Sequence, residues 1–259
     1  MLKVLIVSLK QDVAKRKVIS EKLNNLNVNF EFIDAIYGKS LEQTFFDDLQ
    51  PAGKILNRGF LPTKGEVGCS LSHLKVYKKI LQDKLEWACV LEDDAILDNK
   101  FSDFIENFNA VNFDNLYILG GQEGLDISSK LISKSIFIKE KYGEILFNKV
   151  IFSENYVNRT CCYVISKKTA GKMIAIFEEG FYLADDWYSF KAKCAFKDIF
   201  ISNFVSHPVD LSHSAIEKER QDAYLLLGKN NNKIIRKIGI KLFFSLKYIL
   251  SNIKRFYIC

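Results

Sequence analysis

Residues 87–94 read Trp87-Ala88-Cys89-Val90-Leu91-Glu92-Asp93-Asp94. A short continuous apolar run is typical of a buried strand, and this one ends abruptly in three carboxylates. In an open α/β sheet, ligands bind beyond the carboxyl ends of the strands. Adjacent carboxylates repel one another, so a buried cluster needs a cation or strong hydrogen-bond donors. Glu92 and Asp94 project to the same side if the backbone stays extended. Their hard oxygen ligands suit Mg²⁺ or Mn²⁺, whereas the alternative is an acidic turn in water.

Strand and helix patterns alternate before this stretch. Residues 3–9 are predicted to form a buried strand, residues 12–25 a helix, and residues 28–33 a second strand that is followed by Asp34. This βαβ opening is most often used to bind nucleotides. The chain has neither a G-x-G-x-x-G motif nor a P-loop, which favours metal-mediated binding of phosphates. Asp34 is expected either to contact the nucleotide or to serve as a plain turn residue.

Residues 65–73 introduce the next helix, which is predicted to run to about residue 83. They read Gly65-Glu66-Val67-Gly68-Cys69-Ser70-Leu71-Ser72-His73. Small residues permit a close approach of the backbone to a ligand, and the first turns of a helix have free N–H groups. Ser72 and His73 are therefore candidates for nucleotide binding. The alternative for His73 is a helix histidine with ordinary hydrogen-bond partners.

A second acidic pair, Asp185-Asp186, precedes Trp187. Aromatic rings stack on the apolar faces of sugars, and carboxylates accept hydrogen bonds from sugar hydroxyls, so this pair is a candidate for binding and activating an acceptor. We expect Asp186 to be the catalytic base and Asp185 to be a helix cap or a sugar-hydroxyl ligand, although their order is open. The alternative is a helix N-terminus capped by Asp. His207 and His213 follow a predicted strand at residues 199–205.

Charge is distributed unevenly along the 259 residues. The chain has 37 Lys or Arg and 31 Asp or Glu, but eight of the basic residues and none of the acidic residues follow Gly228. The body is therefore slightly acidic, which argues against a nucleic-acid binder. The six cysteines form no C-x-x-C pair, so neither a zinc ribbon nor a thioredoxin motif is indicated.

Residues 229–259 are predicted to form a basic amphipathic helical tail beside a single domain at residues 1–228. The apolar stripe of the tail consists of Ile235, Ile238, Leu242, Leu246, Ile249 and Ile253. Lys and Arg residues occupy the opposite side, as is typical of helices at anionic membrane surfaces. The alternative is a helix that packs on the protein's own core or on a second subunit.

Several of these stretches together resemble glycosyltransferase family 25, which includes bacterial lipooligosaccharide biosynthesis enzymes. The matching stretches occur in the same order as in the family and extend from residue 1 to about residue 217. They are residues 32–36, 65–73, 90–94, 166–168 and 185–187. Residue 37 departs from the pattern, because Tyr37 stands where an acidic residue is common.

The resemblance implies a GT-A-like, Rossmann-like α/β fold with a mixed central sheet. It also implies a UDP-sugar donor, often UDP-galactose, a divalent metal such as Mn²⁺ or Mg²⁺, and inversion at the anomeric carbon. Glu92, Asp93 and Asp94 would play the part of the D-x-D motif, with Asp94 and Glu92 as metal ligands and Asp93 near the donor. His207 is a further candidate ligand, and His213 is an alternative to it.

The resulting expectation is an inverting β-galactosyltransferase that acts on a lipooligosaccharide or related glycan. With its basic tail, the protein is expected in the cytoplasm, peripheral to the inner face of the bacterial inner membrane. Two other classes remain open. One is another sugar-nucleotide enzyme, such as a nucleotidyltransferase, and the other is a non-catalytic protein that binds carbohydrate or a membrane surface.

Overall fold

The computed structural model describes residues 2–58, 60–125, 128–133, 139–210 and 214–226. The strands are β1 (Lys3–Ser8), β2 (Phe30–Asp34), β3 (Trp87–Glu92), β4 (Asn115–Gly120), β5 (Lys139–Tyr142), β6 (Ile145–Lys149), β7 (Cys162–Ser166) and β8 (Asp198–Val205). The α-helices are α1 (Val13–Asn25), α2 (Gln43–Asp47), α3 (Lys64–Gln82), α4 (Asn99–Asn107), α5 (Lys167–Glu179), α6 (Trp187–Ala192) and α7 (Ala215–Leu226). Short 3₁₀ turns are η1 (Gly38–Ser40), η2 (Gly53–Asn57), η3 (Ser128–Lys130) and η4 (Glu154–Tyr156).

Within the described residues, the strands form one mixed sheet in the order β2-β1-β3-β7-β4-β8-β6-β5. β1 is parallel to β2 and β3, and β4 is parallel to β8. β7 lies antiparallel between β3 and β4, so β1, β2, β3, β4 and β8 all run in the same direction. Their carboxyl ends therefore lie along one edge of the sheet, which is where ligands bind in folds of this kind.

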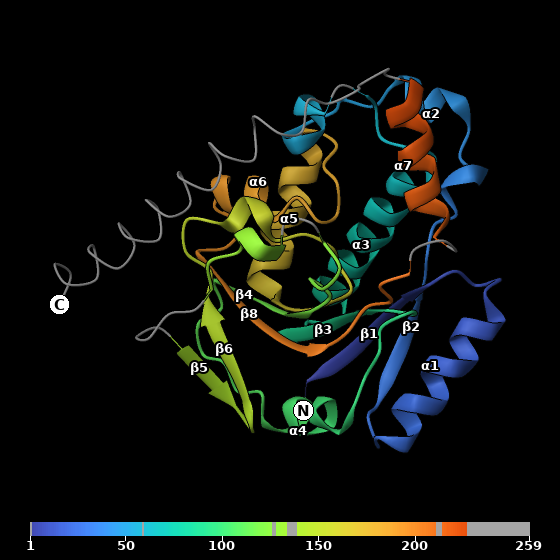
Figure 1. The fold of residues 1–259 in the computed structure, drawn as a ribbon. Helices are drawn as coiled ribbons and strands as arrows, with labels where there is room; N and C mark the ends of the chain where they lie inside the picture. Colours follow the sequence, from blue (N-terminus) through green and yellow to red (C-terminus); the bar gives the residue numbers. More distant parts are fainter. Residues whose placement is uncertain (1, 59, 126–127, 134–138, 211–213, 227–259) are drawn as a thin grey trace, which may run out of the picture.

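Alternate side chains of the strands pack on opposite faces of the sheet. Val4 and Leu91 contribute to a buried cluster with α1 and α4, while Leu5 and Val90 contribute to a second cluster with α3 and α5. Figure 1 shows the same two layers of helices, one on each side of the sheet. This double coverage explains why β3 is a continuous apolar run rather than an alternating one.

The connection after β4 brings that strand's end close to β8. Gly121 has a φ of +79°, and a Cβ added there would lie 2.6 Å from the Cβ of Cys161. Only glycine adopts this conformation without strain at such a distance. The close approach places the β4 exit beside β7 and within van der Waals range of His207, at the same edge as the end of β3.

The structure confirms the predicted GT-A-like α/β class with its βαβ opening and mixed central sheet. Helix α3 agrees with the helix predicted from residues 65–83. The basic tail, the boundary predicted at residue 228 and His213 lie outside the described residues. Within the described part of the chain, no helix combines the length and the apolar character needed to cross a bilayer.

Candidate functional site

Three of the predicted site residues converge at the carboxyl edge of the sheet. Glu92 is the last residue of β3, Asp94 lies in the turn that follows, and His207 follows β8. One ligand atom from each residue lies within 4.8 Å of those from the other two. These are the three residues that the sequence suggested as metal ligands, and together they offer two carboxylates and an imidazole.

A backbone bridge explains why Asp94 and His207 meet. Ile96 N donates a hydrogen bond to Ser206 O at 2.8 Å, and Ser206 N donates to Ile96 O at 3.0 Å. This pair of bonds fastens the turn after β3 to the end of β8. As a result, His207 Nε2 lies 3.7 Å from Asp94 Oδ2.

The tautomer of His207 is set by its other ring nitrogen. Nδ1 lies 2.8 Å from the carbonyl oxygen of Pro208. Because a carbonyl only accepts, Nδ1 carries the hydrogen, and Nε2 of the neutral ring keeps its lone pair toward the carboxylates. A hydrogen bond from the distal nitrogen to a carbonyl is how metal-binding histidines are commonly oriented.

Asp94 lacks the partners that a buried carboxylate needs. Its Oδ1 is buried and has no hydrogen-bond partner among the described residues. Burial, together with the nearby negative charge of Glu92, raises the pKa of Asp94 above its usual value. An orphaned oxygen beside a second carboxylate and an imidazole lone pair is a donor set that suits a divalent cation.

Glu92 is held in place by two side chains that do not belong to the Glu92–Asp94–His207 triad. Its Oε1 accepts a hydrogen bond from the Thr160 hydroxyl at 2.5 Å and lies 3.4 Å from His73 Nε2. Burial alone would raise the pKa of Glu92, but the hydrogen bonds and charge of its neighbours, led by His73, hold that pKa below its usual value. Glu92 is therefore ionised and oriented.

Asp93 points elsewhere. Its Oδ1 lies 3.5 Å from the ammonium of Lys15 at the start of α1. The chain turns directly after Glu92, with Ala95 N donating a hydrogen bond to Glu92 O at 3.2 Å. Glu92 and Asp94 thus meet beside His207 while Asp93 faces Lys15, but through a turn and not through the extended backbone that the sequence suggested. Asp93 does not line the cavity beside the Glu92–Asp94–His207 triad.

Asp185 and Asp186 have different surroundings. Asp186 is 2% exposed and N-caps α6, accepting from Ser189 N at 3.3 Å and from Lys54 N at 2.7 Å. Asp185 faces the cavity, with Oδ1 2.6 Å from Lys54 Nζ and Oδ2 accepting from Arg159 N at 3.1 Å. We therefore move the candidate base from Asp186 to Asp185, because Asp186 is buried at the N-terminus of α6 and does not line the cavity, whereas Asp185 does.

The cavity is lined by the triad and by Asp185 and has a volume of about 150 Å³. Its wall includes residues from α3, the β7 approach, the loop before α6, and α7. The lining residues are Glu66, Cys69, Ser70, Glu92, Asp94, Arg159, Thr160, Leu183, Ala184, Asp185, His207, Ser214, Ile216, Glu217 and Arg220. The cavity is thus lined by both acidic and basic side chains, as a site for a charged and hydroxylated ligand would be.

The other predicted nucleotide-binding residues have structural partners. The Ser72 hydroxyl donates to Gly68 O at 2.6 Å and accepts from Ile36 N at 2.8 Å, which ties α3 to the loop after β2. His73 is fully buried and reaches Glu92 rather than the cavity. Asp34 is half-exposed at the end of β2 and pairs with Arg16 at 2.6 Å.

Sequence patterns missed three cationic residues of the site. Lys54 comes from η2, Arg159 precedes β7 with a φ of +61°, and Arg220 lies on α7. Arg220 Nε donates to Glu66 Oε1 at 2.7 Å, so α7 is fastened to α3 beside the cavity. No sequence motif predicts these residues, because each belongs to a different segment and only the tertiary fold places them at the site.

The sequence of this chain matches a known protein family and several glycosyltransferases. A family described as "Glycosyltransferase family 25 (LPS biosynthesis protein)" matches residues 1–188. The chain is 36% identical over 95 residues to procollagen galactosyltransferase 1-B of Xenopus laevis, a match that covers 35% of this chain and 16% of that protein. It is 31% identical over 106 residues to a putative glycosyltransferase of Haemophilus influenzae, covering 39% of this chain and 35% of that one.

The chain also resembles a protein that is named as probably inactive and a glycosyltransferase of known structure. A probable inactive glycosyltransferase 25 family member 3 of Rattus norvegicus is 28% identical over 107 residues, covering 40% of this chain and 19% of that protein. Among solved structures, a glycosyltransferase involved in the glycosylation of the major capsid of PBCV-1 aligns with a TM-score of 0.41 at 8% identity, covering 86% of this chain and 98% of that one. The family match spans β1 through the start of α6 and contains Glu92, Asp94 and Asp185. The chain belongs to glycosyltransferase family 25.

Proposed function

We propose that this protein transfers a hexose from a UDP-sugar to a hydroxyl group of a glycan, with a divalent cation and with inversion at the anomeric carbon. The observation that carries the proposal is the Glu92–Asp94–His207 triad at the end of β3, which lines a cavity that Asp185 also lines. The cavity thus brings a metal-binding group and a further carboxylate, which is not one of its ligands, to one site. A single displacement needs both, because the attacking hydroxyl and the departing diphosphate lie on opposite sides of the sugar and cannot be served by the same carboxylate.

The triad would hold Mn²⁺ or Mg²⁺ through Asp94, Glu92 and the Nε2 of His207. When bound, the cation supplies electrostatic stabilisation of the negative charge that develops on the departing diphosphate. Thr160 and His73 keep Glu92 ionised and oriented, and the Pro208 carbonyl keeps the lone pair of His207 directed inward. Arg159 and Arg220 also line the cavity and would add positive charge for an anionic donor.

Asp185 is our candidate for the carboxylate that accepts the acceptor's proton. Burial opposes its ionisation, but the charges of Lys54 and Arg220 and the hydrogen bonds from Lys54 and the Arg159 backbone hold the pKa of Asp185 well below its usual range. Asp185 is thus proton-free at neutral pH, although it is a weak base. An alcohol becomes strongly acidic as its oxygen bonds to the anomeric carbon, so a weak base suffices if proton transfer comes late.

The sugar and acceptor are proposed from the relatives. The name of the Xenopus relative states galactosyl transfer, which supports galactose as the transferred sugar. With UDP-galactose as the proposed donor, inversion at its α-linked anomeric carbon would give a β-linked product. The family description refers to LPS biosynthesis, which supports a lipooligosaccharide or related glycan as the acceptor. The basic residues after Gly228 would then hold the enzyme at the anionic inner face of the bacterial inner membrane, where such acceptors are built.

A non-catalytic carbohydrate-binding role is the second candidate. The observation in its favour is that family relatives such as the Rattus norvegicus protein are named as probably inactive. A nucleotidyltransferase activity is the other rival, and the two enzymatic classes differ in their products. Transfer of the sugar releases the nucleoside diphosphate, whereas nucleotidyl transfer releases pyrophosphate or consumes it.

The experiment is an incubation of the protein with a panel of UDP- and GDP-sugars, with and without Mn²⁺, followed by separation of the products. The proposal expects slow, Mn²⁺-dependent release of UDP that is fastest with UDP-galactose. Formation of UTP or GTP and a sugar 1-phosphate when pyrophosphate is added to the incubation would instead favour the nucleotidyltransferase. No turnover of any donor, combined with glycan binding, would favour the non-catalytic role.

A further inference from the structure

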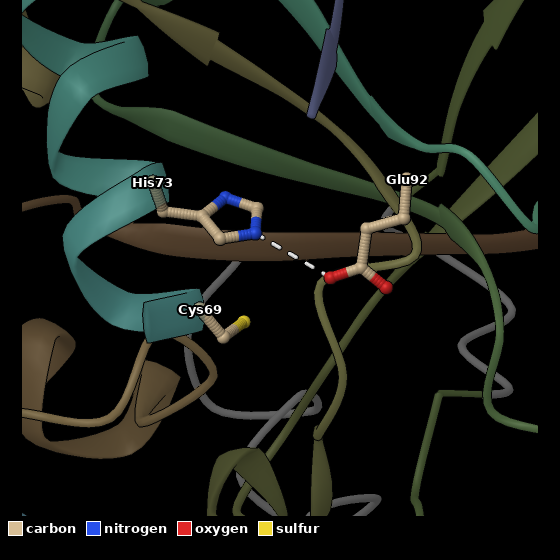
Figure 2. Close-up of side chains that lie close together, drawn as sticks. All are labelled: Cys69, His73 and Glu92. Atoms are coloured by element: carbon tan, nitrogen blue, oxygen red, sulfur yellow. Dashed lines mark hydrogen bonds and ion pairs between the residues drawn. The ribbon is translucent and has the colours of Figure 1, made fainter. Parts of the chain in front are cut away.

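Glu92 belongs to a second group of side chains whose atoms are of metal-ligating types. Cys69 and His73 lie one turn apart on α3, and one ligand atom from each lies within 4.8 Å of the other and of a Glu92 oxygen. Figure 2 shows both side chains extending from the helix toward Glu92. Ligands spaced four residues apart lie on the same face of a helix, and a third ligand from a neighbouring strand completes a common three-ligand arrangement.

The histidine of this group is oriented in the way that metal ligands usually are. His73 Nδ1 lies 2.7 Å from the Tyr163 hydroxyl, which in turn lies 3.3 Å from the Tyr77 hydroxyl. This buried chain of hydrogen bonds fixes the ring and directs Nε2 to Glu92 at 3.4 Å. An outer hydrogen bond of this kind sets ring orientation and raises ligand basicity.

The cysteine connects the group to solvent. Cys69 is partly exposed and lines the cavity, whereas His73 behind it is fully buried. An ion could therefore enter from the cavity and keep an open coordination position on that side, which three-ligand zinc sites typically have. Burial and the charges of Glu92 and Asp185 raise the pKa of the Cys69 thiol, and a bound cation would release the thiol proton to solvent.

The donor types distinguish this group from the Glu92–Asp94–His207 triad. Thiolate sulfur and imidazole nitrogen favour zinc and similar thiophilic ions, whereas Mg²⁺ and Mn²⁺ favour oxygen. The triad contains two carboxylates and no sulfur, and Cys69, His73 and Glu92 contain only one carboxylate. The two groups therefore select different ions although they share Glu92.

We propose that Cys69, His73 and Glu92 form a binding site for a thiophilic divalent cation of the zinc class. Because Glu92 also belongs to the triad, zinc at this site draws one carboxylate away from the triad and weakens Mn²⁺ binding there. The zinc site stands on the geometry of its own three residues. Only its effect on Mn²⁺ rests on the proposed function.

The test uses Co²⁺, a spectroscopically visible substitute for Zn²⁺, added to the metal-free full-length protein without a histidine tag. The expected result is a sulfur-to-cobalt charge-transfer band that Zn²⁺ abolishes by displacement. The band should be lost in Cys69→Ser and retained in Cys161→Ser and Cys194→Ser. Cys161 is buried beside the triad and Cys194 is exposed, so these variants control for the other nearby thiol and for an unrelated one.

Absence of the band in the wild type, its persistence in Cys69→Ser, or its loss in Cys161→Ser would overturn the proposal. A second measurement needs no variant. The rate at which Cys69 of the wild type is alkylated is measured by mass spectrometry of its peptide, and Zn²⁺ should lower that rate. Equal rates with and without Zn²⁺ would also contradict the site. Mn²⁺ binding followed by electron paramagnetic resonance separates the two proposals. A cobalt–thiolate band without any Mn²⁺ binding would leave the zinc site standing and remove the proposed transferase metal.

Discussion

His207 Nε2 lies 3.7 Å from Asp94 Oδ2, although the two residues follow strands at different positions in the sheet. The backbone bridge between Ile96 and Ser206 creates this relationship, and the Pro208 carbonyl decides which nitrogen of His207 takes part in it. The ionisable groups are thus brought together by hydrogen bonds that are independent of their own charge. Such an arrangement is pre-organised for a ligand, because the backbone rather than the ligand supplies the convergence.

The hydroxyl of Thr160 should tune the metal site without binding the metal. It donates to Glu92 Oε1 at 2.5 Å, and loss of such an outer partner typically weakens metal binding by about 10–100-fold. We expect Thr160→Val to lower Mn²⁺ affinity in that range, measured by titration calorimetry. Thr160→Ser keeps the hydroxyl and should bind Mn²⁺ like the wild type, and equal affinity in Thr160→Val would argue that Glu92 is not a ligand.

The pair Asp185 and Asp186 offers a matched comparison of catalysis and stability. Asp185→Asn removes a cavity-facing carboxylate, and we expect kcat to fall by about 10²–10⁴-fold with little change in donor affinity. Asp186→Asn removes one of the acceptors that hold Lys54 N and Ser189 N. It should cost about 1–3 kcal/mol of stability and leave kcat per folded molecule nearly unchanged.

Kinetics and denaturant unfolding of both variants check this pair. If Asp186→Asn lost turnover while Asp185→Asn kept it, the order suggested by the sequence would be restored. If both kept turnover, the proton would be taken by another cavity carboxylate, and Glu217→Gln would be the next variant to measure.

Glu66 should make the stability of the fold depend on pH. It is 2% exposed and accepts hydrogen bonds from both Arg58 and Arg220. Burial opposes its ionisation, but the two arginines prevail and lower the pKa of Glu66 below its usual value. A glutamate in the unfolded chain titrates near about 4.3. Below that pH the unfolded chain takes up the proton first, so the stabilisation is complete above it and is lost as pH falls through the folded pKa.

The measurement for Glu66 is the free energy of unfolding as a function of pH for the wild type and Glu66→Gln. At neutral pH the variant should be less stable by about 3 kcal/mol, because it leaves two guanidinium groups without their carboxylate. The difference should shrink as pH falls below about 4. A difference that stayed constant down to the acid transition would show that the ion pairs contribute little.

The basic residues after Gly228 predict that the protein binds to anionic membranes. A chain that ends at Gly228 should keep its thermal transition and its donor hydrolysis, and should lose binding to vesicles that contain anionic lipids. Co-sedimentation at low and high salt checks this, with neutral vesicles as the control. Full-length protein that ignores anionic vesicles at low salt would contradict the membrane proposal.

The sequence predicted the parts of the site that are carried by local pattern. The apolar run before Glu92 places that residue at a strand end, as the structure confirms, and the helix predicted from residues 65–83 is also present. The sequence attributed the separation of Asp93 from Glu92 and Asp94 to an extended backbone, whereas in the structure it arises from a turn after Glu92. His207 could be placed after a strand, but its meeting with Asp94 depends on strand order, which the chain's local patterns do not specify.

The different surroundings of Asp185 and Asp186 could not be predicted from the sequence for a related reason. Adjacent acids before a helix both fit a capping position. Asp186 is the one that is buried and accepts a hydrogen bond from Lys54 N, which lies in a segment distant in the sequence, and Asp185 is left to face the cavity. Ser72 was likewise suggested as a nucleotide-binding residue because it lies near a helix start. The structure instead uses its hydroxyl to satisfy Ile36 N, a demand that arises only when the loop after β2 packs on α3.

The measurement that tests the central claim most directly is calorimetric titration of UDP into the protein with and without Mn²⁺, for the wild type, Asp94→Asn and Asp93→Asn. The two substitutions make the same chemical change one residue apart, but only Asp94 has an unpaired buried oxygen in the triad, while Asp93 pairs with Lys15. We expect Mn²⁺ to strengthen UDP binding in the wild type and in Asp93→Asn, and Asp94→Asn to lose at least about 10-fold of that gain. UDP binding that is independent of Mn²⁺ in the wild type, or an Asp94→Asn variant that responds to Mn²⁺ as the wild type does, would contradict the assignment of the triad as the site of the donor's metal.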